Sequence, residues 1–192
     1  AAWLPPLTEA LKAEGFKIRL WPIDSGVIDP ASEPPPGLWI NRISPSSHTR
    51  GHHHSVGLAR EILAWLRAHR RRVINGLDAF ELEMSKLRQD IALRRHGIRT
   101  PRTILAVGRE QILKAATEFD GPFITKHNQG GKGLGIHLFR SPEELATYLD
   151  SDDFDAGPNG QIILQQYIEP VPKTADDYLL KGPAHQSRQL SK

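Results

Sequence analysis

Cysteine is absent from this 192-residue sequence. Its absence excludes disulfide bonds, zinc sites built on thiolates, and cysteine nucleophiles. The sequence also lacks a run of roughly 18 uncharged apolar residues, which a membrane-spanning helix needs. Residues 1–10 have neither the basic start nor the apolar centre of a signal peptide. We therefore expect a soluble, cytoplasmic protein with no membrane partner.

A strong charge of either sign is missing too. The chain has 25 Lys and Arg residues against 22 Asp and Glu residues, a formal net charge of +3. This small charge permits a nucleic-acid partner without indicating one. RNA binding would also need exposed aromatic residues, and the spacing places Trp65 on an apolar helical face instead. We expect no nucleic-acid partner and keep a basic RNA-binding protein as the weakest alternative.

Helical and strand-like segments alternate along the chain. Pro5 and Pro6 enter a helical pattern that ends at Gly15, and Ser141 opens a helix with a capping box. The remaining patterns predict helices over residues 55–72, 79–96 and 110–119, and strands over residues 17–21, 38–43, 73–74, 122–126, 136–139 and 161–168, with another strand starting near residue 100. This alternation favours an α/β fold.

The most distinctive local feature is a glycine-rich loop over residues 126–135, between two predicted strands. It contains Gly130, Gly131, Gly133 and Gly135 together with Lys126 and Lys132. Closely spaced glycines let backbone amides approach an anion, and the lysines add positive charge, so the loop suits a triphosphate. The alternative is a mobile surface hairpin. Other phosphate-binding motifs fit less well, because no G-x-x-x-x-G-K-[ST] motif is present.

Several segments, in their order along the chain, resemble the ATP-grasp superfamily. They are Ser85-Lys86, residues 97–103 (GIRTPRT), residues 122–126 (PFITK), the glycine-rich loop and residues 164–168 (LQQYI). Residues 41–51 (NRISPSSHTRG) and 73–76 (VING) are similar to the RimK-like branch of carboxylate–amine ligases. The resemblance extends over about residues 37–170.

The resemblance implies an α/β fold in which a pre-ATP-grasp Rossmann-like domain precedes an ATP-grasp lid subdomain. The implied divisions are a first domain at residues 1–76, a helical connector and linking strand at 77–104, the lid at 105–170 and an unassigned tail at 171–192. The C-terminal ATP-grasp subdomain, which carries the magnesium ligands in the family, is expected to be largely missing. We therefore expect this chain to be inactive alone.

By the same resemblance, Lys86 and Lys126 contact the nucleotide phosphates, and the glycine-rich loop closes over them. The adenine is received by the hinge that follows the lid, and Gln165 stands where many family members have a glutamate. The implied ATP-binding set is Lys86, Lys126, Gly130, Gly131, Lys132, Gly133, Gly135, Gln165, Gln166, Tyr167 and Ile168.

The implied chemistry joins a carboxylate to an amine through an acyl phosphate, with ATP and Mg²⁺ as cofactors and small-molecule or peptide substrates. Arg42, Ser46 and Arg50 are the candidate acceptor-binding residues, and the alternative is a helix-entry loop whose arginines face solvent. No catalytic residue or metal ligand is assigned. Asp176-Asp177 and residues 52–54 (HHH) are poor metal sites, because adjacent side chains diverge on most backbones. A non-catalytic nucleotide-binding or interaction module remains the main alternative, and homo-oligomerisation stays open.

Overall fold

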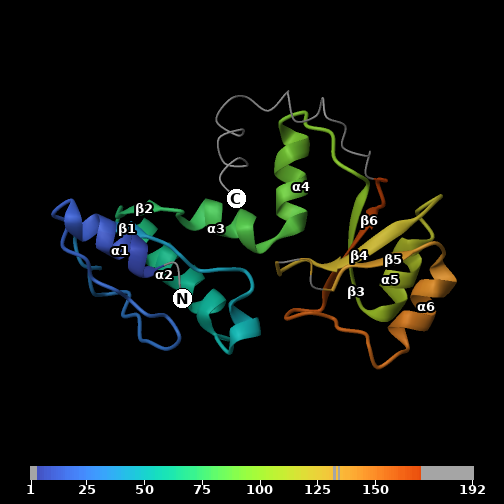
Figure 1. The fold of residues 1–192 in the computed structure, drawn as a ribbon, viewed down its shortest axis with the longest axis horizontal. Helices are drawn as coiled ribbons and strands as arrows, with labels where there is room; N and C mark the ends of the chain where they lie inside the picture. Colours follow the sequence, from blue (N-terminus) through green and yellow to red (C-terminus); the bar gives the residue numbers. More distant parts are fainter. Residues whose placement is uncertain (1–3, 132, 134, 170–192) are drawn as a thin grey trace, which may run out of the picture.

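The computed structural model describes residues 4–131, 133 and 135–169, which form two lobes on either side of helix α4 (Figure 1). The first lobe contains α1 (Leu4–Ala13), β1 (Leu38–Ile40), the 3-10 helix η1 (Ser47–Arg50), α2 (Ser55–Ala68), β2 (Arg72–Ile74) and α3 (Leu77–Met84). After α4 (Lys86–Arg95), the second lobe contains β3 (Thr103–Val107), α5 (Arg109–Ala116), β4 (Phe123–His127), β5 (His137–Phe139), α6 (Pro142–Leu149) and β6 (Gln161–Gln166). None of the described helices is long and apolar enough to cross a membrane.

The core of the first lobe lies between α2 and α3. Apolar residues recur along α2 at helical spacing, and Leu66 belongs to one buried cluster with Phe80 and Met84 of α3. Strands β1 and β2 pair in parallel, with Trp39 opposite Val73. Because α2 lies between these strands in the chain, the three elements form a β–α–β unit.

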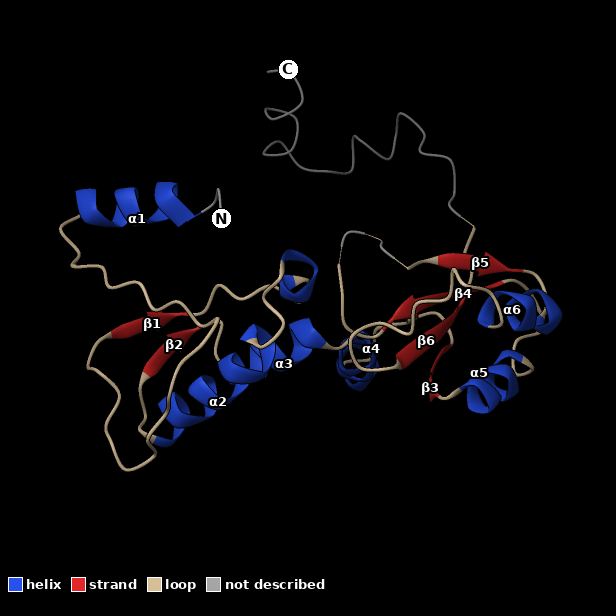
Figure 2. Ribbon diagram, turned by 90° about the horizontal axis from the view of Figure 1, so that it is seen from below, coloured by secondary structure: helices blue, strands red, loops and turns tan. Residues whose placement is uncertain are grey.

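The core of the second lobe lies on one face of an antiparallel sheet with the strand order β3-β6-β4-β5. Alternate residues of the strands, including Ala106, Phe123 and Leu164, are buried in one cluster with Ala116 of α5 and Leu145 of α6. Both helices therefore cover the same face of the sheet (Figure 2).

The opposite face of this sheet carries polar side chains. Thr103 pairs with Gln165 across β3 and β6, and Lys126 lies opposite Ile163 across β4 and β6. Since successive side chains of a strand point to opposite faces, Thr103, Lys126 and Gln165 project away from α5 and α6. Helix α4 contacts β3 on this side, where Asp90 lies 3.5 Å from the hydroxyl of Thr103.

The α/β prediction is confirmed, as are the helices after Pro5, from Ser55 and over α5 and the strands at β2, β4, β5 and β6. The capping box is confirmed as well, because Ser141 accepts a hydrogen bond from the amide of Glu144 at 3.4 Å. The linking strand was predicted from about residue 100 and begins at Thr103. The tail from residue 170 onward lies outside the described residues.

Two strand predictions were wrong. Residues 17–21 form no strand, and no described strand pairs with their backbone, although Trp21 packs against Trp39 of β1. The buried strand predicted over residues 38–43 is only the three-residue β1, in which Leu38 is 55% exposed and Ile40 38% exposed. The described sheet of the first lobe has two strands, which is too few to cover these side chains.

The single helix predicted over residues 79–96 was also wrong. The helix breaks at Ser85, whose backbone is extended (φ −139°, ψ 114°) and separates α3 from α4. The hydroxyl of Ser85 accepts a hydrogen bond from the amide of Arg88 at 3.2 Å, so Ser85 is the N-cap of a new helix. Helical periodicity on both sides of the break concealed this N-cap.

Candidate functional site

Lys86 and Lys126 approach each other near the start of the glycine-rich loop. Lys86 is the first residue of α4, and its Nζ donates to the carbonyl of Gly130 at 3.2 Å and lies 3.5 Å from that of Asn128. Lys126 lies in β4, and its Nζ donates to Oε1 of Gln165 in β6 at 2.7 Å. The fold thus brings two cations from distant parts of the sequence to one place.

Burial lowers the pKa of both Lys86 and Lys126 below the ordinary value of 10.5. Repulsion from Lys126 lowers the pKa of Lys86 further, whereas the carboxylate of Asp90 raises that of Lys126. Two partly buried cations that repel each other are unfavourable unless an anion binds beside them. This pair is therefore the strongest indication of an anion site in the described part of the chain.

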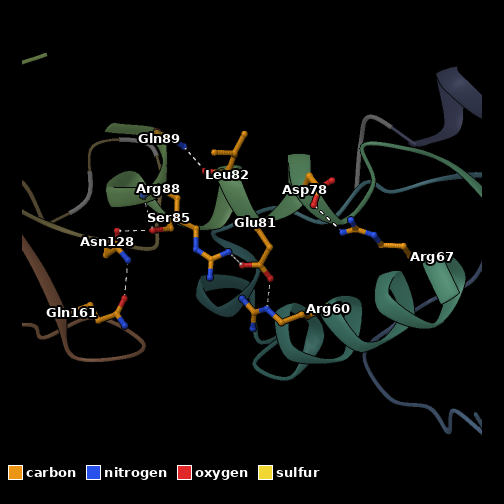
Figure 3. A network of polar contacts seen from close by, with 10 residues as sticks. All are labelled: Arg60, Arg67, Asp78, Glu81, Leu82, Ser85, Arg88, Gln89, Asn128 and Gln161. Carbon is orange, nitrogen blue, oxygen red and sulfur yellow. Dashed lines mark hydrogen bonds and ion pairs between the residues drawn. The ribbon is translucent and has the colours of Figure 1, made fainter. Parts of the chain in front are cut away.

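Asn128 closes the N-terminus of α4 beside Lys86, and Figure 3 shows its contacts with Ser85 and Gln161. Its Oδ1 accepts hydrogen bonds from the amide of Leu87 at 3.0 Å and the hydroxyl of Ser85 at 3.2 Å, and its carbonyl accepts from the amide of Lys86 at 3.1 Å. Asn128 donates in turn to Gln161 of β6 at 2.7 Å. Protein atoms thus satisfy the first amides of α4, so the side chain of Lys86, rather than the helix terminus, is available to an anion.

The start of α4 is also fastened to the first lobe. Glu81 of α3 accepts hydrogen bonds from Arg60 of α2 and, at 2.7 Å, from Arg88 of α4 (Figure 3). The side chain of Glu81 is 17% exposed, so these contacts are less screened than ordinary surface ion pairs. The connection holds α4, and with it Lys86, in a fixed relation to α2 and α3.

The ring of His127 lies between the backbones of Gly135 and Gly157. A Cβ added to Gly135 would lie 2.9 Å from Cε1 of the ring, and one added to Gly157 would lie 2.8 Å from Cγ. Both glycines also have positive φ angles, 71° and 70°. Nε2 of His127 lies 2.8 Å from the carbonyl oxygen of Asp155. The end of the glycine-rich loop is therefore packed tightly against β4 at a position that only glycine can occupy.

The rest of the loop offers backbone amides. Gly130 is partly buried, whereas Gly131 and Gly133 are exposed. No described residue accepts a hydrogen bond from the amides of these three glycines. Lys132 lies outside the described residues.

The hinge residues differ in how their amides are used. The amide of Gln166 donates to the carbonyl of Arg102 at 2.9 Å, and that of Tyr167 donates to the carbonyl of Pro122 at 3.0 Å. Ile168 is 58% exposed, and its amide has no acceptor among the described residues. Of the three hinge amides, that of Ile168 is the one open to a ligand.

The loop of Arg42, Ser46 and Arg50 lies against the glycine-rich loop. Nε2 of Gln129 donates to the carbonyl of Pro45 at 3.3 Å, which joins the two loops. Ser46 is buried and accepts a hydrogen bond from Arg50 at 3.1 Å, while Arg42 is exposed and has no hydrogen-bond partner among the described residues. The structure thus brings Ser46 and Arg50 together and leaves Arg42 apart.

The described residues do not fit a magnesium site, because no three His, Cys, Asp or Glu side chains among them are grouped to hold a metal ion. In the stretch of three histidines, His52 pairs with Asp24 at 2.6 Å. Ser55 donates to the same carboxylate at 3.1 Å. Asp176 and Asp177 lie outside the described residues.

Residue patterns alone did not reveal the supporting residues Thr103, Asp90, Asn128 and Gln161. Each acts through a partner that is distant in the sequence, so local spacing contains no sign of the contact. One signal was present: Asn128 lies two residues after a predicted strand and precedes the glycines, a position from which a short amide side chain can satisfy nearby backbone groups.

Comparison with solved structures shows the fold. The RimK-domain ATP-grasp protein from Sphaerobacter thermophilus DSM 20745 is 20% identical, with a TM-score of 0.57 over 85% of this chain and 58% of that chain. A D-cycloserine synthetase is 21% identical, with a TM-score of 0.53 over 86% of this chain and 54% of that chain. Both likenesses extend over most of the present chain but little more than half of the other protein.

The sequence relatives match a smaller part of this chain than the solved structures do. A D-alanine–D-alanine ligase from Pseudomonas putida (strain GB-1) is 32% identical over 95 residues, 49% of this chain and 29% of the relative. The same enzyme from Pseudomonas entomophila (strain L48) is 30% identical over 95 residues. The chain therefore matches less than a third of the length of these relatives. The model of the RimK-like ATP-grasp domain matches residues 84–176. The segment that carries Lys86, Lys126 and the glycine-rich loop is thus similar to the RimK-like ATP-grasp domain.

Proposed function

We propose that this chain supplies the ATP-binding part of a ligase that joins a carboxylate to an amine. The observation that carries the proposal is the pair of half-buried ammonium groups, Lys86 and Lys126, beside the glycine-rich loop. Charge-assisted contacts to phosphate would relieve their mutual repulsion. The match of residues 84–176 to the RimK-like ATP-grasp domain supports a nucleotide triphosphate as the anion.

The described residues fit ATP in two further ways. The amides of Gly130, Gly131 and Gly133 suit the triphosphate, and Lys132 completes the proposed set from outside the described residues. The open amide of Ile168 suits a ring nitrogen of the adenine, since a strand end offers both donors and acceptors. We retain Gln165, Gln166 and Tyr167 as hinge residues, and the domain boundaries after residues 76, 104 and 170, as parts of the proposal.

The proposed reaction has two steps. An oxygen of the substrate carboxylate bonds to the γ-phosphorus of ATP while the bond to ADP breaks, which gives an acyl phosphate. The amine then attacks the acyl carbon, phosphate leaves with its bonding electrons, and the nitrogen loses a proton. Lys86 and Lys126 would offset negative charge on the phosphoryl groups. Because no described residues fit a magnesium site, no step is assigned to the metal.

The acceptor carboxylate is assigned to the loop that contains Ser46 and Arg50. Its contact with the glycine-rich loop, through Gln129 and Pro45, supports this assignment. An arginine can hold a carboxylate through two parallel hydrogen bonds, and the exposed Arg42 is the second candidate for that contact.

Calorimetric titration with Mg-ATP tests the proposed nucleotide site. Wild-type chain should bind, and the double variant Lys86→Ala, Lys126→Ala should lose roughly 100-fold or more in affinity, because each lost charged hydrogen bond is worth about 1.5–3 kcal/mol. Lys114→Ala is the matched control, since Lys114 is exposed on α5 and this helix covers the other face of the sheet. Absence of binding by folded wild-type chain, or equal binding by the double variant, would contradict the proposal.

A further inference from the structure

We infer that Gln165, itself held by Thr103, is a positioning residue that directs the ammonium group of Lys126 toward the nucleotide phosphates without neutralising its charge. This inference rests on the proposed nucleotide site. It differs from the role implied for Gln165 by family resemblance, which is a direct contact with the adenine.

The hydrogen bonds of Gln165 run in one direction only. An ammonium group has donors and no acceptor, so the atom of Gln165 that faces Lys126 at 2.7 Å must be the oxygen Oε1. The amide nitrogen Nε2 must then face Thr103, whose hydroxyl accepts the hydrogen bond at 2.8 Å. That hydroxyl has its own proton left for the carbonyl of Pro101, 3.0 Å away. Gln165 therefore cannot reverse its amide without losing the bond to Lys126.

The far end of this chain of contacts is anchored in α4. The hydroxyl of Thr103 lies 3.5 Å from Oδ1 of Asp90, and Asp90 is buried and accepts a hydrogen bond from Arg94 at 2.6 Å. Arg94 also donates to the carbonyl of Pro101 at 3.0 Å. Thr103 accepts from Gln165 and donates to the carbonyl of Pro101, which Arg94 also holds, so the orientation of Gln165 is set before any ligand arrives.

A neutral amide at residue 165 has an electrostatic consequence. Nζ of Lys126 forms no ion pair with a described carboxylate: Asp90 acts on it from beyond ion-pair distance, and its hydrogen-bond partner is the amide oxygen of Gln165. A glutamate at the same place would form a partly buried ion pair with Lys126 and set a negative charge beside the phosphates. Gln165 orients the ammonium group and leaves its positive charge for the nucleotide.

Binding of Mg-ATP and of adenosine, measured in parallel on the whole chain, separates positioning from direct adenine contact. We expect Gln165→Glu to weaken Mg-ATP binding by roughly tenfold, the effect of one charged contact, and to leave adenosine binding unchanged. Thr103→Val should weaken Mg-ATP binding roughly threefold to tenfold, because Gln165 loses its acceptor. Thr103→Ser keeps the hydroxyl and should retain wild-type affinity.

A double-mutant cycle makes the test specific to Lys126. In a Lys126→Ala background, Gln165→Glu should lose most of its effect on Mg-ATP affinity, because the residue through which it acts is gone. The inference would be overturned if folded Gln165→Glu kept its Mg-ATP affinity, or if it lost adenosine affinity to the same extent. In either case, Mg-ATP binding by the wild type would still support the nucleotide site. No Mg-ATP binding by the wild type would instead overturn the proposed function itself.

Discussion

Lys126 is subject to opposing influences on its charge. Burial lowers its pKa, whereas a bound triphosphate would favour the charged form, as Asp90 does in the free protein. Lys86 is the other charged group nearby, and its pKa is lowered as well. Both lysines therefore lose their protons at a lower pH than an exposed lysine does.

The first prediction is that Mg-ATP affinity falls as the pH is raised, at a pH below the ordinary lysine value of 10.5. The terminal phosphate is already ionised above about pH 7, so a fall above that pH reports on the lysines. In the unliganded chain the sign is reversed: between the lowered pKa and 10.5 the unfolded state binds more protons, and stability rises with pH. Calorimetric titrations and denaturant unfolding at several pH values check both trends. An Mg-ATP affinity that does not change up to pH 10.5 would contradict the first trend.

The second prediction compares two glycines of one loop that have nearly equal φ angles. Gly157 has φ 70° and would place a Cβ 2.8 Å from Cγ of His127, whereas Gly160 has φ 67° and open space around it. Gly160→Ala should cost about 1 kcal/mol of unfolding free energy for its backbone alone. Gly157→Ala should cost at least about 2 kcal/mol more, because the ring must move. Equal losses in urea unfolding would show that His127 adapts freely.

The role of a residue could be predicted from the sequence when its contacts are with residues nearby in the chain. The glycines of residues 130–135 and their two lysines could be recognised as a phosphate-binding composition from sequence alone. The role of Gln165 could not, since its partners Lys126 and Thr103 lie on strands that meet only in the folded sheet. The same applies to His127, whose ring packs against Gly157, a residue distant from it in the sequence.

The N-terminus of α4 is capped in part by a residue of the second lobe. Asn128 supplies both a side-chain oxygen and a carbonyl to the first turn of α4, in addition to the local cap from Ser85. The end of β4 and the start of α4 are thereby joined at the place where Lys86 emerges.

The third prediction concerns Asn128→Ala, which leaves the amide of Leu87 without its acceptor. We expect a loss of about 1–3 kcal/mol in unfolding free energy and weaker Mg-ATP binding, because Lys86 is no longer held in place. Asn159→Ala is the matched control: Asn159 is exposed and donates to the same Gln161 side chain at 3.4 Å without contacting α4. A similar loss of unfolding free energy in the two variants would show that the contacts of Asn128 with α4 add nothing to stability.

Elements were predictable where their ends carry a local signal. Ser141 and Pro142 mark the start of α6 within the sequence itself, and β4 shows strict alternation of buried and half-buried residues. The break at Ser85 was missed because the residues on both sides continue a helical pattern. Strand β1 was overestimated because apolar composition cannot show whether neighbouring strands exist to cover it.

At the scale of the whole molecule, the described residues form two separate cores, one around α2 and α3 and the other between the sheet and helices α5 and α6. The described polar contacts between the lobes are few and centre on Ser85, Lys86, Asn128 and Gln129. All four tryptophans precede residue 66, so tryptophan fluorescence reports on the first lobe alone.

The fourth prediction is that the two lobes unfold in separable transitions. Leu66→Ala and Leu145→Ala each truncate a buried leucine, at 1% and 0% exposure, and should each cost about 2–5 kcal/mol within their own core. Leu66→Ala should shift the fluorescence transition, whereas Leu145→Ala should shift mainly the transition seen by far-ultraviolet circular dichroism. Coincident transitions in both variants would show one cooperative unit.

At this scale the sequence indicated the α/β class, but the meeting of Lys86 with Lys126 was implied only by family resemblance. Periodicity predicts elements, and it does not say which elements become neighbours. The sheet order β3-β6-β4-β5 illustrates the difference, since no local pattern places the last strand in the interior of the sheet.

That strand order also bears on how the lobe is made on the ribosome. Strand β3 and the pair β4–β5 are not neighbours in the sheet, and both are joined by β6, the last of the described strands to be synthesised. Until residues 161–166 emerge, β3 and one side of β4 expose unpaired backbone groups. A nascent chain that ends before β6 also lacks Gln165. Newly made chains should therefore become able to bind nucleotide only as β6 enters the sheet.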